Sequence, residues 1–270
     1  MNILSLFQYE FMIRALIVGT LIGISGALLG VFLVLKHYSM IGDGLAHVSF
    51  ASVAIALVLG ATPLLFSLPL VIGASLLIMH LSERNELHAD AAIGLVSSFS
   101  VALGIFLSSL KGGFGVDLNS YLFGSILVIR PLEVWVSVIL GVGVVAAIAF
   151  FHTELIVLTY DEDYARTLGL NTRLLNQLLA LLTSVTILLG IRMVGTLLIS
   201  SMIIFPAITA LQLKRSFHMT LLLSVLVSLI CVLGGIMFSF VLNTPTGATI
   251  VLLNGLIFAG IYLIKRVRAQ

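Results

Sequence analysis

The sequence predicts an all-α membrane protein that crosses the bilayer eight or nine times. Hydrophobic residues make up 60% of the 270 residues, charged residues only 9%, and the mean hydropathy is +1.26. Such a chain carries more apolar surface than a soluble core can bury. The apolar residues also occur in runs of about 20, the length of an α-helix that crosses the hydrocarbon core of a membrane. We expect residues 1–270 to form one transmembrane domain.

Nine apolar runs satisfy this length criterion. No positive charge precedes Arg14 and no small-residue cleavage pattern follows the first run, so we expect a retained span and not a signal peptide. The predicted spans are residues 12–35, 44–60, 63–81, 91–110, 132–151, 175–191, 194–213, 219–241 and 247–264. The junctions at 61–63 and 191–193 are very short, which leaves the count at eight or nine.

The distribution of Lys and Arg predicts the orientation, because cytoplasmic loops carry an excess of both. With nine spans and a cytoplasmic C-terminus, the outer side keeps only Arg14, Lys111, Arg130 and Arg192. The inner side receives Lys36, Arg84, Arg166, Arg173, Lys214, Arg215, Lys265, Arg266 and Arg268. The net charge of +2 and this dispersal of basic residues argue against a nucleic-acid surface.

Two absences limit where a functional site can lie. Cys231 is the only cysteine, which excludes an intrachain disulfide and a cysteine-rich metal site. No Asp or Glu follows Asp163, so the last hundred or so residues cannot supply a second carboxylate site. In the span at 194–213, we expect the hydroxyl residues Thr196, Ser200 and Ser201 to serve close helix packing.

A Gly-rich turn and a short apolar run occupy residues 111–130. The apolar run is too short to cross the bilayer. It predicts either a helix at the outer surface that helps to form a lid, or a plain connector with an amphipathic helix. The later segment 243–249, NTPTGAT, predicts an outer turn between two helices.

Asp43 and His47 open an otherwise apolar run at residues 39–60 and are the strongest candidates for a functional site. Residues four apart lie on one face of a helix, so their side chains are expected to be neighbours. An acid within a membrane segment is costly and is a functional candidate for that reason. A carboxylate and an imidazole can ligate zinc, manganese or ferrous iron.

One chain supplies only two ligands here. Two copies related by a two-fold axis would supply four, enough for a tetrahedral or partly hydrated ion. The alternative is that Asp43 caps the N-terminus of its helix and that His47 bonds to a neighbouring carbonyl. The other histidines are expected at helix ends and loops and not as ligands: His37, His80, His88, His152 and His218.

The longest polar segment is residues 152–173. Within it, acids from Asp161 to Asp163 suit the first turn of a short helix, and Gly169 is a suitable stop. The charge distribution places this segment in the cytoplasm. We therefore interpret it either as a docking site for a soluble partner or as a solvated connector.

The run MIGDGLAHVSFASVAIALVLG resembles the signature of the ABC-3 family of membrane permeases, which take up zinc, manganese or iron in bacteria. Its core is Gly42, Asp43, Gly44, Leu45, Ala46 and His47. Further matches are DAAIGLVSS at 90–98, YDEDYARTLGL at 160–170, VGTLLISSMIIFPAITA at 194–210 and PTGATIVLLNG at 245–255. The resemblance therefore extends along almost the whole chain.

This resemblance implies a type II ABC importer fold, akin to the vitamin B12 permease with fewer spans, that works as a homodimer in the bacterial cytoplasmic membrane. It implies Asp43 and His47 as ligands of the transported metal, and an extracellular metal-binding protein that delivers the ion. It also implies two ATPase subunits that dock on the 160–170 helix. The matching coupling positions are Tyr160, Asp161, Asp163, Ala165, Arg166, Leu168 and Gly169.

Neither a phosphate-binding loop GxxxxGK[ST] nor a metalloprotease motif HExxH occurs in the chain. We therefore expect a transport subunit that is not an enzyme and binds no cofactor, with ATP on a separate ATPase. The form GDGLAH resembles the zinc-type members, so zinc is the expected cargo, with manganese or iron as the alternative. A different class remains open, namely a secondary ion carrier that uses Asp43 as a proton relay.

Overall fold

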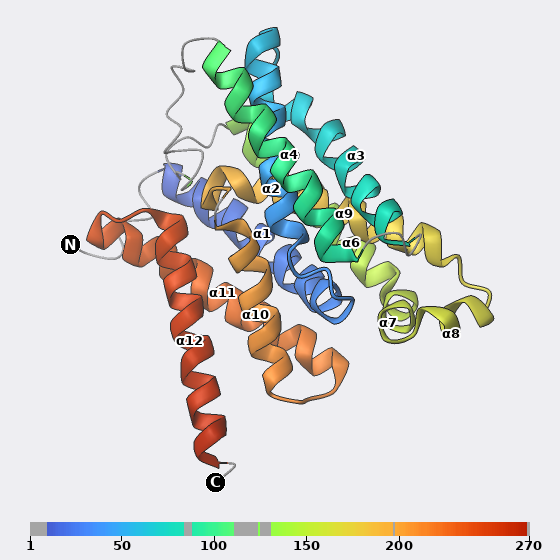
Figure 1. Ribbon diagram of the computed structural model, residues 1–270. Coiled ribbons are helices and arrows are strands. Elements are labelled where there is room, and N and C mark those ends of the chain that lie inside the picture. The colour runs from blue at the N-terminus through green and yellow to red at the C-terminus, as the bar shows by residue number, and fades with distance from the viewer. Residues whose placement is uncertain (1–9, 84–87, 111–123, 125–130, 197, 269–270) are drawn as a thin grey trace.

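The structure is a computed structural model that describes residues 10–83, 88–110, 124, 131–196 and 198–268. Every regular element within these residues is an α-helix (Figure 1). The helices are α1 (Glu10–Leu35), α2 (Ile41–Leu59), α3 (Pro63–Glu83), α4 (Ala89–Leu110), α6 (Pro131–Phe150), α7 (His152–Tyr160), α8 (Glu162–Thr167), α9 (Thr172–Val194), α10 (Ile199–Gln212), α11 (Phe217–Leu242) and α12 (Thr246–Arg268).

Within the described residues, seven helices are long and apolar enough to cross a membrane, namely α1, α2, α3, α4, α9, α11 and α12. Helices α6 and α7 meet at an angle of 70°. They would add an eighth span if this bent pair crosses the membrane as one unit. The all-helical, many-span architecture agrees with the prediction. The described residues provide seven candidate spans, or eight with the bent pair, against the eight or nine predicted.

The predicted span at 194–213 is the main departure. Helix α9 continues to Val194, where Gly195 adopts a φ of 92° and caps it. The next helix, α10, begins only at Ile199 and has 14 residues. At 1.5 Å per residue it is about 21 Å long, which is shorter than the hydrocarbon core. Glycine breaks the apolar run because it readily adopts this backbone conformation.

The turn predicted at 243–249 is present. Helix α11 ends at Leu242, the left-handed residue Asn243 caps it, and α12 begins at Thr246. The surface helix predicted for 111–130 lies outside the described residues, apart from Gly124.

Helix α1 lies at the centre of the packing and contacts α6, α9, α10 and α11. Its glycines allow the close approach, since a Cβ on Gly30 would collide with the main-chain oxygen of Ile203. Serines on α11 add hydrogen bonds across the helices: Ser228 Oγ donates to the Gly23 carbonyl at 2.9 Å, and Ser224 Oγ to the Ala27 carbonyl at 3.0 Å. Small residues and interhelical hydrogen bonds are the usual basis of helix packing in membranes.

Figure 1 shows the positions of α2, α7, α8 and α12. Helices α7 and α8 stand at one edge of the bundle, and α12 projects from the rest and leads to the C-terminus. Between them, α2 lies inside the bundle, against α3, α4 and α9.

We predict that Gly30→Ala destabilises the protein by about 1–3 kcal/mol, the usual cost of overpacking. The reason is that the new methyl group would overlap the Ile203 carbonyl. The matched control is Gly73→Ala, since a Cβ on Gly73 meets nothing within 4 Å and alanine favours a helix. Thermal unfolding in detergent measures both, and equal melting temperatures for the two variants would contradict the packing described for α1.

Candidate functional site

A tight turn after α1 sets the start of α2. His37 has a φ of 61°, and the Tyr38 amide donates to the Leu33 carbonyl at 2.8 Å, a pattern that closes the end of a helix. The chain thus reverses direction within a few residues. Helix α2 then begins at Ile41.

Asp43 lies in the first turn of α2 but does not cap it. The N-cap is Met40, which makes no side-chain capping hydrogen bond. The Asp43 amide already donates to the Met40 carbonyl at 3.1 Å, so its backbone belongs to the helix. The alternative interpretation of Asp43 as an N-cap is therefore wrong, because the helix begins three residues earlier than that interpretation requires.

Asp43 and His47 are neighbours on α2. The distance from His47 Nε2 to Asp43 Oδ2 is 3.7 Å, and the side chains are 23% and 37% exposed, respectively. By contrast, the residues between them in the sequence, Leu45 and Ala46, are fully buried. The pair therefore presents an oxygen and a nitrogen donor on the part of α2 that the rest of the chain leaves open.

Two glycines hold this first turn against the neighbouring helices. A Cβ on Gly42 would lie 2.9 Å from Ser200 Oγ on α10, and a Cβ on Gly44 would lie 2.8 Å from Ile93 Cγ2 on α4. Any larger side chain would push α2 away from one of these helices. Gly42 and Gly44 therefore fix the position of the intervening Asp43, a role that the sequence analysis did not assign to them.

No group of three or more His, Cys, Asp and Glu side chains that could hold a metal ion occurs in the described part of the chain. The pair on α2 thus offers two ligands and requires others from elsewhere. Two is the number that the sequence analysis expected of one chain.

Buried hydroxyl groups lie close to this turn. Thr196 and Ser200 are buried, and neither hydroxyl has a hydrogen-bond partner among the described residues. The contact of Ser200 with Gly42 fits the packing role expected from the sequence. The sequence does not predict that these hydroxyls lack a hydrogen-bond partner, because their surroundings depend on where α10 begins.

Two histidines form a second pair that sequence spacing does not reveal. The rings of His152 and His218, at the starts of α7 and α11, have centroids 4.7 Å apart. Residues 66 positions apart in the sequence carry no periodic signal, so only the fold brings them together.

The segment 152–173 forms two short helices. Asp161 ends α7 and caps α8, where its carboxylate accepts a hydrogen bond from the Tyr164 amide at 2.9 Å. After α8, Gly169 has a φ of 79°. The acids at the start and the glycine stop expected from the sequence are both present.

Helix α8 buries one side and exposes the other. Ala165 is fully buried, whereas Tyr160 is 67% exposed and Leu168 is 54% exposed. Asp163 is more exposed still and pairs with Arg166 at 3.3 Å. Tyr160 ends α7 and Leu168 follows α8, so an aromatic and an aliphatic side chain flank α8 at the surface.

Glu162, one of the acids expected at the start of this helix, anchors α8 to the bundle. It pairs with Lys36 after α1 at 3.2 Å and with Arg166 at 2.8 Å, and Asn176 on α9 donates to both of its oxygens at 3.4 Å. Burial by itself raises the pKa of Glu162, but Lys36, Asn176 and Arg166 outweigh it and hold that pKa below its usual value.

The chain matches one protein family over most of its length. The model of the ABC 3 transport family matches residues 8–265, which is nearly the whole chain. The chain belongs to the ABC 3 transport family. This ABC 3 permease is therefore a membrane transport subunit and not an enzyme.

Its relatives cover it almost from end to end. The manganese transport system membrane protein MntC of Listeria innocua is 32% identical over 253 residues, which are 94% of this chain and 90% of that protein. A Haemophilus influenzae protein named as a probable iron transport system membrane protein is 30% identical over 270 residues, 97% of each chain.

A solved structure shows the same fold. The structure of PsaBC from Streptococcus pneumoniae in complex with Fab includes a chain that matches with a TM-score of 0.84 and 27% identity. The match covers 96% of the ABC 3 permease and 93% of that chain. The expected type II importer fold is thereby confirmed.

We predict that Glu162→Gln lowers the melting temperature at pH 7 and that the difference from wild type shrinks in acid. A depressed folded-state pKa stabilises the fold above the unfolded-state pKa of about 4.3, and this contribution is lost as pH falls through the folded-state pKa. Melting curves in detergent between pH 7 and 3 test this. Asp163→Asn is the control, since that exposed acid does not contact Lys36 or Asn176, and a difference independent of pH would contradict the prediction.

Proposed function

We propose that the ABC 3 permease forms the membrane pathway of an ATP-driven importer of a divalent transition metal, with manganese as its cargo. The observation that carries the proposal is the adjacent carboxylate and imidazole of Asp43 and His47, held on α2 by two close-packed glycines. The manganese and iron names of the relatives point to the same class of cargo.

The metal is bound between two copies of the chain. Each copy contributes Asp43 and His47, so a two-fold axis brings together two carboxylates and two imidazoles. Such mixed oxygen and nitrogen ligands accept Mn²⁺, Fe²⁺ and Zn²⁺. Without a thiolate the site holds its ion weakly enough to release it, as a transport pathway requires.

Manganese takes the place of the zinc expected from GDGLAH, because the relatives' names give zinc no support. Iron is the second candidate. Family membership also favours an ATP-driven permease over a secondary carrier with Asp43 as a proton relay, since a carrier needs no ATPase.

The ATPase docks on α8 and the residues around it. Tyr160 and Leu168 offer an exposed aromatic and an exposed aliphatic side chain, and Asp163 and Arg166 add charges. With an ATPase docked on α8, α8 and the C-terminus lie on the cytoplasmic side. An extracellular metal-binding protein would deliver the ion to the opposite face. Counted with 194–213 as a crossing segment, the inner loops carry the excess of basic residues, which supports this orientation.

We predict that Asp43→Asn and His47→Ala each abolish metal uptake while the permease and its ATPase stay assembled. Both variants remove a ligand atom without adding bulk. The assay is uptake of Mn²⁺, Fe²⁺ and Zn²⁺ into vesicles that contain permease and ATPase. The control is His80→Ala, which alters an exposed histidine in the last turn of α3. Normal uptake by both variants would overturn the metal site, and a preference for Zn²⁺ would overturn manganese alone.

A separate prediction concerns docking. Leu168→Ala together with Tyr160→Ala should release the ATPase, because the two substitutions remove the exposed apolar side chains next to α8. Co-purification of the ATPase with the tagged permease measures this. Exposed apolar residues elsewhere serve as the control, and Leu256→Ala on α12 should leave the complex intact. Retention of the ATPase by the double variant would contradict the docking site.

A further inference from the structure

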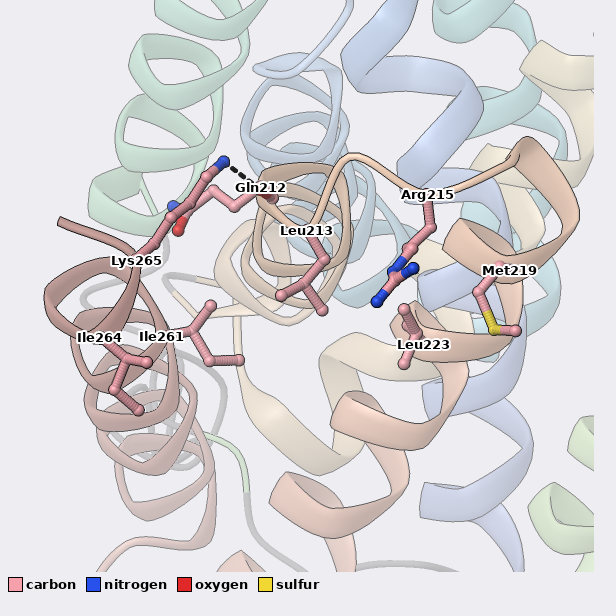
Figure 2. A pocket seen from close by; sticks show the side chains of 8 residues that line it. All are labelled: Gln212, Leu213, Arg215, Met219, Leu223, Ile261, Ile264 and Lys265. Atoms are coloured by element: carbon pink, nitrogen blue, oxygen red, sulfur yellow. Dashed lines mark hydrogen bonds between the residues drawn. The ribbon is translucent and has the colours of Figure 1, made fainter. Parts of the chain in front are cut away.

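A cavity of about 680 Å³ lies where the end of α10, the start of α11 and the end of α12 meet. It is separate from Asp43 and His47 and from α8. Figure 2 shows the side chains that line it: Gln212, Leu213, Arg215, Met219, Leu223, Ile261, Ile264 and Lys265.

The lining combines an apolar wall with two cations. Figure 2 shows Leu213 between Arg215 on one side and Lys265 on the other, with Ile261 on α12 below Lys265. The remaining lining is also largely aliphatic. A ligand that fits this cavity therefore needs an anionic group and an apolar part.

Among the described residues, no carboxylate pairs with either cation, Arg215 or Lys265. No Asp or Glu follows Asp163 in the sequence. The Lys265 ammonium instead donates to the main-chain oxygen of Gln212. Unneutralised cations at the end of apolar helices favour an anionic ligand.

The cavity lies on the same face of the bundle as α8. The Phe217 ring at the start of α11 has its centroid 5.8 Å from that of Tyr160 and 5.4 Å from that of Phe32 near the end of α1. Next to the cavity, Leu222 on α11 and Leu263 on α12 are exposed, as side chains that face lipid would be. The cavity therefore lies beside exposed apolar side chains, near the ends of two helices long and apolar enough to cross a membrane.

We propose that this cavity binds an anionic phospholipid from the leaflet on the side of α8. The phosphate lies between Arg215 and Lys265, and the acyl chains extend along the apolar walls that α11 and α12 provide. Basic pockets between membrane helices bind anionic head groups for this reason. A free phosphate would bind the cations but would leave the aliphatic lining exposed to water. The site requires only that the protein lies in a membrane, so its test is independent of metal and ATPase.

The test is a lipid titration of the purified full-length permease, followed by native mass spectrometry. Phosphatidylglycerol should bind at least tenfold more tightly than phosphatidylcholine. In the double variant Arg215→Gln with Lys265→Gln, its affinity should fall roughly 30-fold, or about fivefold for each basic residue. Replacement by the other cation, Arg215→Lys with Lys265→Arg, should retain binding and so exclude misfolding as the cause.

The matched control is Arg266→Gln, which removes the same charge one residue further along α12 from a side chain that does not line the cavity. It should leave phosphatidylglycerol binding within about twofold of wild type. Equal binding of phosphatidylcholine, or an equal loss in Arg266→Gln, would overturn the site. Displacement of the lipid by inorganic phosphate at equal concentration would assign the cavity to a free anion. Dissociation of a dimer in the double variant would assign the cavity to a second copy. Either result would overturn the lipid site.

Discussion

The close contact that α2 makes with α4 and α10 is the constraint on which the candidate site depends. At Gly42 and Gly44 the neighbouring atoms lie where a side chain would have its Cβ. The turn between them therefore has little freedom to shift, and Asp43 is held on the open side. A ligand pair built on a rigid helix keeps its geometry better than one on a loop. If two copies share the ion, as proposed, this rigidity matters more, because each copy supplies only two ligands.

A short connection links this turn to α8. Lys36 pairs with Glu162 on α8, and only residues 37–40 separate Lys36 from the first residue of α2. The same carboxylate contacts Asn176 on α9, so three segments meet at one partly buried charge. A displacement of α8 would thus act directly on the connection that leads into α2. The fold places the candidate docking helix one tight turn away from the candidate ligands.

The sequence was sufficient for whatever depends on local pattern. Runs of apolar residues located the long helices, the spacing of Asp43 and His47 placed them side by side, and the residue order around Asp161 gave the start of α8. Prediction from the sequence failed where tertiary contacts determine the structure. The apolar run at 194–213 hides the break at Gly195, since hydropathy is insensitive to φ.

The roles of Gly42 and Glu162 were equally out of reach from the sequence. Gly42 matters because Ser200, more than 150 residues later, packs against it. Glu162 was one acid among several until the structure brought Lys36 and Asn176 to it. Partners distant in the sequence leave no periodic trace in a single chain. The same limit applies to the cargo, because one carboxylate and one imidazole suit several divalent metals.

We propose that two copies of the chain hold one metal ion between their α2 helices. Anomalous X-ray diffraction at the manganese edge, from crystals of the assembled transporter loaded with Mn²⁺, tests it most directly. A single peak on the two-fold axis, within coordination distance of Asp43 and His47 of both copies, is the result expected. A peak bound by one copy alone, or one remote from α2, would contradict it.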